Sequence, residues 1–129
     1  MRIASFIAQY LLGLLFTFSG LNGFFNFTPM PPKPPLATEF LHALMASHYA
    51  IAVFVLQLSS GILFLVNRYV PLALTLIAPV IVNILLFHLS MDPRGIVPGV
   101  IAAVCWLLVF CRFWPVFAGI FRHHVQPVR

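Results

Sequence analysis

The chain has 129 residues, of which 62% are hydrophobic and only 7% are charged. So few polar side chains could not cover the surface of a water-soluble domain of this length, which excludes a soluble globular fold. The net charge of +5 comes from seven scattered Lys and Arg residues rather than from a clustered basic stripe, which excludes a nucleic-acid-binding surface. The sequence therefore predicts an all-α integral membrane protein.

Four apolar runs divide the chain, each about long enough to cross a hydrocarbon core of roughly 30 Å as a helix. Prolines, glycines and charged residues separate them. Asp92 to Gly95 has the residues that a type I turn favours at its first, second and fourth positions. We expect a four-transmembrane-helix bundle forming a single domain over residues 1–129. Its predicted spans are residues 3–25, 49–66, 69–91 and 96–121.

The segment between the first two spans, residues 26–48, is too polar to cross a membrane. It begins with five prolines among residues 28–35, which favour extended or irregular backbone. Residues 36–48 then carry apolar side chains at helical spacing, with Thr38 as an N-cap candidate. We predict a short interfacial or re-entrant helix, held close to the end of the first span as a lid over the outer mouth of the bundle.

The distribution of basic residues predicts the orientation. Two of the connecting loops hold only Lys33 and Arg94, whereas the opposite side, including both termini, is richer in arginine. The positive-inside rule then places both termini in the cytoplasm, and both carboxylates, Glu39 and Asp92, on the outer side. The arginines counted toward the cytoplasmic side are Arg2, Arg68, Arg112, Arg122 and Arg129.

Four polar residues within or at the ends of the spans form the candidate ligand-binding set. A polar group in hydrocarbon is costly unless it faces protein or water, so such residues are the default site hypothesis. In the predicted topology they lie from mid-membrane to the outer end of the bundle. Glu39 and Asp92 are expected at the outer mouth or in pairs with neighbouring residues. The candidate ligand-binding residues are Asn22, Gln57, Asn83 and His88.

Each candidate also has a structural interpretation. His88 and Asp92 are four residues apart, so they can pair on one helix face. Asn83 follows Pro79 by four residues, where it could compensate for backbone groups freed by a kink or bond to another span. Gln57 shares a face with Ser60 and Gly61, which is typical of a helix-packing seam, and a second small-residue seam is Ser19-x-x-x-Gly23.

The sequence contains no complete catalytic motif, so any enzymatic activity would be that of a subunit in an oxidoreductase. Cys105 and Cys111 are six residues apart on one predicted helix and cannot bond to each other, and there is no Cys-x-x-Cys pair. The histidines do not stand in a Cys-x-x-Cys or His-Glu-x-x-His motif of the kind that binds a metal, so no metal is expected. Arg112, followed by Trp114, is interpreted as an anchor that extends to the membrane interface.

Three stretches resemble the DoxX-like family of small bacterial four-span membrane proteins. They are LLFTFSGLNGFF at residues 14–25, VPLAL at residues 70–74 and APVIVNILLFH at residues 78–88. The resemblance extends to about Pro93 and fades through the fourth span. It implies a bacterial inner-membrane protein associated with sulfur or oxidative-stress metabolism, in some members as a subunit of a quinone-linked oxidoreductase. Family members often carry a glutamate where this chain has Gln57, so a proton-coupled role there is weakened.

Three functional classes follow. The first is an accessory, quinone-linked redox subunit that binds a small amphiphile in the outer half of the bundle. The second is a non-catalytic assembly subunit that holds a partner redox enzyme or a second copy of itself. The third is a transporter of a small solute or lipid, for which no internal inverted repeat is evident. We prefer the first class narrowly.

Overall fold

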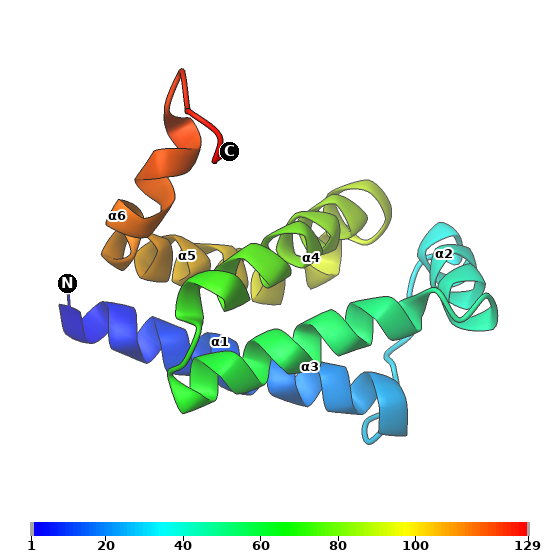
Figure 1. Cartoon of the computed structure of the whole chain (residues 1–129). Helices are drawn as coiled ribbons and strands as arrows, with labels where there is room; N and C mark the ends of the chain where they lie inside the picture. The colour runs from blue at the N-terminus through cyan, green and yellow to red at the C-terminus, as the bar shows by residue number, and fades with distance from the viewer. Residues whose placement is uncertain (1, 129) are drawn as a thin grey trace.

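The computed structural model describes residues 2–128, and all regular structure within them is helical (Figure 1). Three predicted spans agree with observed helices to within one residue at each end. Arg129, which contributed to the predicted orientation, lies outside the described residues. The elements are α1 (Arg2–Phe25), α2 (Pro35–Ala46), α3 (Ala50–Val66), α4 (Val70–Met91), η1 (Pro93–Gly95), α5 (Val97–Arg112), α6 (Trp114–Phe117) and η2 (Ala118–Phe121).

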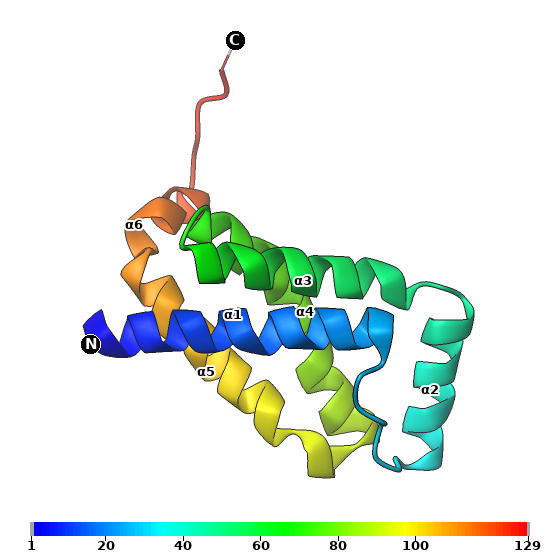
Figure 2. The same cartoon turned by 90° about the horizontal axis from the view of Figure 1, so that it is seen from below.

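The four long helices form a ring in which α1 and α4 each pack against both α3 and α5. Successive long helices run in opposite directions, so the segments that connect them lie at the two ends of the ring (Figures 1 and 2). The arginine-rich end holds Arg2 at the start of α1, Arg68 between α3 and α4, and Arg112 at the close of α5. The opposite end, here the α2 end, holds α2, the loop of residues 26–34 and η1. The chain's only two carboxylates, Glu39 and Asp92, lie at the α2 end.

The predicted fourth span is divided rather than continuous. Helix α5 stops at Arg112, and the segment from Trp114 to Phe121 turns away by 82°. Pro115 gives the physical reason, since it lacks an N–H group and its ring would clash with the preceding turn of a continuous helix. The aromatic rings of Phe110 and Phe117 pack across the bend with centroids 5.0 Å apart.

Helix α2 occupies the predicted short helical segment and meets α3 at an angle of 86°. Its first turn differs from the prediction, because the helix begins at Pro35 and Thr38 is not its N-cap. The Thr38 hydroxyl instead donates to the carbonyl of Pro34, at 3.1 Å, within the first turn. Phe40 of α2 packs against Phe87 of α4 with ring centroids 5.6 Å apart, which ties α2 to the bundle.

Helices α1 and α4 are each long and apolar enough to cross a membrane. The number of spanning segments rises to four if the bent pairs α2 with α3 and α5 with α6 and η2 are each counted as one span. Large hydrophobic side chains are exposed along all four long helices. Apolar surface around the whole ring is compatible with a multi-pass membrane protein, because lipid rather than water would cover it.

The backbones of α1 and α3 approach each other closely at two glycines. A Cβ atom added to Gly61 would lie 2.5 Å from the backbone nitrogen of Thr17, and one added to Gly20 would lie 2.8 Å from that of Leu58. Small residues are therefore required here for the backbones to approach, as the predicted Gln57, Ser60 and Gly61 seam implies. The large apolar side chains that are fully buried in the core of the four helices are Leu12, Phe16, Phe64, Leu74, Ile77 and Val109.

Candidate functional site

At the α2 end, Asp92 joins two segments that are distant in sequence. It is buried in the turn after α4, and its carboxylate accepts a hydrogen bond from Lys33 Nζ at 3.1 Å. Both side chains are largely screened from solvent, at 10% and 17% exposed. The ion pair therefore fixes the proline-rich loop against the turn between α4 and α5. The type I turn predicted for these residues is present as η1, with Gly95 N donating to Asp92 O at 3.2 Å.

His88 lies beside Asp92, as their spacing predicts. Its Nδ1 is 3.1 Å from the carbonyl oxygen of Asp92 and 3.9 Å from the carboxylate. The backbone of Gly95 lies against the ring, since an added Cβ would be 2.7 Å from the imidazole. His88 is therefore enclosed in the turn that closes α4. Glu39, the other predicted outer-mouth residue, is exposed on α2 and does not join this cluster.

The two asparagines of the predicted set bond within their own segments. The Asn22 side-chain oxygen accepts a hydrogen bond from Thr28 N at 3.0 Å and so shapes the chain as it leaves α1. The Asn83 amide donates to the carbonyl of Pro79, one turn earlier on α4, at 3.0 Å. Asn83 lies on the exposed side of that helix, beside Val82 rather than facing the core.

Gln57 is the member of the predicted set that faces the interior. Only 8% of it is exposed. One turn further along α3, the Ser60 hydroxyl is buried without a partner, and so is the Thr17 hydroxyl on α1. These neutral polar groups can donate to a carbonyl but carry no charge. The four predicted ligand residues are thus divided among an interior position, an exposed face and two turns.

A second polar cluster, which sequence reasoning did not assemble, lies at the arginine-rich end. Gln9 of α1 is fully buried, and its amide nitrogen donates to Phe64 O at 3.0 Å and to the side-chain oxygen of Asn67 at 2.9 Å. Its amide oxygen accepts a hydrogen bond from Arg112 Nη2. Gln9 therefore connects three helices through one side chain.

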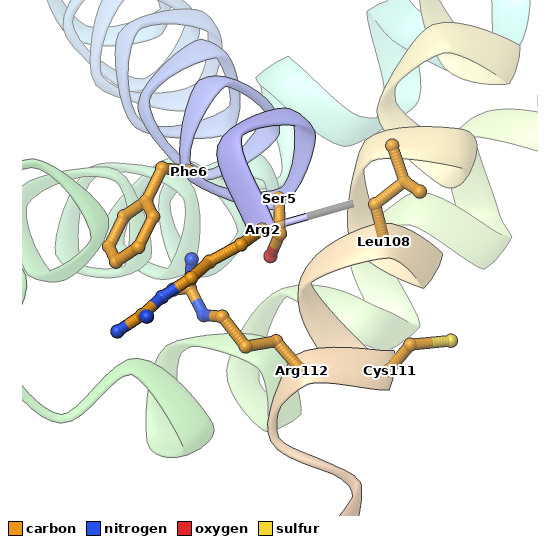
Figure 3. A pocket seen from close by; sticks show the side chains of 6 residues that line it. All are labelled: Arg2, Ser5, Phe6, Leu108, Cys111 and Arg112. Atoms are coloured by element: carbon orange, nitrogen blue, oxygen red, sulfur yellow. The ribbon is translucent and has the colours of Figure 1, made fainter.

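Arg112 does not extend outward as the anchor that the sequence predicted. Its guanidinium turns inward over the Phe6 ring, 4.0 Å from the centroid, where cation–π attraction favours it. A pocket of about 400 Å³ opens beside it, between the start of α1 and the end of α5 (Figure 3). Its lining residues are Arg2, Ser5, Phe6, Leu108, Cys111 and Arg112.

The remaining reactive side chains are the two cysteines and the residues that could bind a metal. Cys105 is buried and Cys111 is exposed, and both are free thiols. No group of three or more His, Cys, Asp or Glu side chains in residues 2–128 is placed to hold a metal ion. The two polar clusters described above offer hydrogen-bond donors and charge.

Comparison of the chain with protein-family models, with curated proteins and with solved structures finds no match.

Proposed function

We propose that the chain is a DoxX-like, four-span protein of the bacterial inner membrane that serves as an accessory subunit in quinone-linked redox metabolism. Its task is to bind the quinone, and the electrons are handled by a partner enzyme. The arginine-rich end faces the cytoplasm in this proposal, because basic residues are retained on that side of a membrane. Both termini then also lie in the cytoplasm.

The observation that carries the proposal is the position of Gln57 in the interior of the bundle. Gln57 is only 8% exposed, and an amide in apolar surroundings, above all in a membrane, is stabilised by a hydrogen-bond partner. A quinone carbonyl accepts hydrogen bonds and would satisfy the Gln57 amide, while its ring suits apolar surroundings. A neutral amide orients a quinone without supplying a proton, which fits a binding subunit.

A second candidate, a membrane assembly subunit, is favoured by the position of Asn83. This residue presents an amide on the exposed side of α4, at a depth where lipid would otherwise surround it. Its bond to Pro79 uses one donor, and its side-chain oxygen remains free to accept a bond from another helix. Polar side chains on the lipid-facing side of a helix often mark contacts between subunits.

Native mass spectrometry of protein released gently from its own membrane separates the two candidates. For a quinone-binding subunit, we expect a quinone mass that is lost in Gln57→Leu and retained in Asn83→Leu and in the tail control Gln126→Leu. For an assembly subunit, we expect a partner or second copy that is lost in Asn83→Leu. An unchanged spectrum in Gln57→Leu, with a quinone still bound, would overturn the proposed role of this residue.

A further inference from the structure

We propose that the pocket at the arginine-rich end binds the phosphate group of an anionic phospholipid. The site is formed by the first turn of α1 and the last turn of α5, and it is separate from Gln57. The inference therefore does not rest on the proposed quinone function.

Hydrogen-bond donors without partners line this pocket. The Ser5 hydroxyl is buried and unpaired, with only 4% of the residue exposed, and Nη1 of Arg112 is also buried and unpaired. Because the pocket lies at the beginning of α1, the amide groups of the first helical turn add further free donors and the positive end of the helix dipole. A phosphate oxygen would satisfy these groups together.

The charged side chains that line the pocket are all positive. Arg2 and Arg112 both line it (Figure 3), whereas Glu39 and Asp92 lie at the α2 end and Asp92 is already paired with Lys33. A guanidinium screened from water is costly without a counter-charge, and the described residues supply none here. Arg112 is also held in place by Gln9 and the Phe6 ring, so it needs little rearrangement to bind an anion.

A neighbouring apolar groove explains why the phosphate would belong to a lipid. The groove is shallow, is lined by side chains of α1 alone, and shares Phe6 with the pocket. A phosphate in the pocket would therefore place the attached acyl chain directly against the groove. The groove residues are Ile3, Phe6, Ile7, Tyr10, Leu11 and Leu14.

The test is titration of the delipidated full chain in detergent with dioleoyl phosphatidylglycerol, followed by native mass spectrometry. Dioleoylglycerol tests the acyl chains alone, and inorganic phosphate tests the anion alone. We expect the phospholipid to bind, the diglyceride to bind at least about tenfold more weakly, and inorganic phosphate to leave phospholipid binding unchanged. Equal binding of phospholipid and diglyceride would overturn the site, and displacement by inorganic phosphate would reassign it to a free anion.

Two variants locate the site on the protein. Arg112→Gln and Arg2→Gln should each weaken phospholipid binding about tenfold, because each removes a charged donor. Arg2 is exposed at the helix start, so its replacement tests the pocket even if the Arg112 variant unfolds. Arg94→Gln, at the opposite end, is the charge-matched control. Equal affinities of the Arg2 and Arg94 variants would exclude this pocket as the site.

Discussion

Arg112 at the end of α5 donates a hydrogen bond to the side-chain oxygen of Gln9 on α1, 103 residues earlier in the chain. The same Gln9 side chain donates to the carbonyl of Phe64 on α3. Three helices thus meet at one buried amide. Interhelical hydrogen bonds of this kind help to hold helices together where, as in lipid, apolar side chains have little hydrophobic reason to associate.

Replacement of Gln9 by leucine should lower the stability of the fold. The variant removes the acceptor for Arg112 and the donor to Phe64, and leaves a screened guanidinium unpaired, at a cost of about 1–3 kcal/mol. We expect a lower thermal unfolding midpoint in detergent micelles. The Gln126→Leu variant, in the exposed tail, is the matched control. Equal midpoints for the two variants would show that the Gln9 bonds contribute nothing net.

The contact between α1 and α3 gives a prediction that depends on geometry alone. Gly61→Ala places a methyl group 2.5 Å from the Thr17 backbone nitrogen, so the helices must separate. Overpacking of this kind typically costs about 1–3 kcal/mol. Gly119→Ala is the control, because an added methyl there meets no atom within 4 Å. Thermal unfolding of both variants should show a loss for Gly61→Ala and almost no change for Gly119→Ala.

The sequence predicted the helices well because their signals are local. Apolar runs of spanning length and Pro or Gly punctuation placed three helices to within one residue. The bend after Arg112 also had a local signal, since Pro115 lacks an N–H group and its ring clashes with the preceding helical turn, but the continuous hydrophobicity on both sides favoured a single span.

The candidate sites were harder to predict, because the long helices are apolar on nearly every side and give no hint of which face is buried. Asn83 was expected to bind a ligand, to compensate for backbone groups freed at Pro79 or to bond to another span; it bonds to the Pro79 carbonyl and lies on the exposed side of α4. The contact between Gln9 and Arg112 depends on α1 packing beside α5, which no short-range pattern encodes. Gln9 did have the same signal as Gln57, a lone amide within an apolar run.

Replacement of Pro115 by alanine should straighten the chain after α5. The variant restores a backbone N–H group and removes the clash between the ring and the preceding turn. Spin labels at Val104 and Ile120, both exposed, would then move apart toward the value of about 24 Å for a continuous helix. If the measured distance does not change, the packing of Phe110 on Phe117 rather than the proline sets the bend.

The ion pair between Lys33 and Asp92 should anchor the proline-rich loop. Because both side chains are largely screened, Asp92→Asn is expected to cost about 1–3 kcal/mol, between the values typical of exposed and of buried pairs. Release of the loop should also accelerate proteolytic cleavage within residues 26–34. The chain's other carboxylate supplies the control, since Glu39 is exposed on α2 and Glu39→Gln should leave stability and cleavage unchanged.

A double-mutant cycle with Lys33→Met distinguishes the ion pair from other roles of Asp92. If the pair is the source of the stability, Asp92→Asn should cost much less in the Lys33→Met background than in the unaltered chain. The residual cost would then report the contact between the Asp92 carboxylate and His88 Nδ1, 3.9 Å away. An undiminished cost in that background would mean that Lys33 plays no part in the effect of Asp92, and that the carboxylate acts only within the turn after α4.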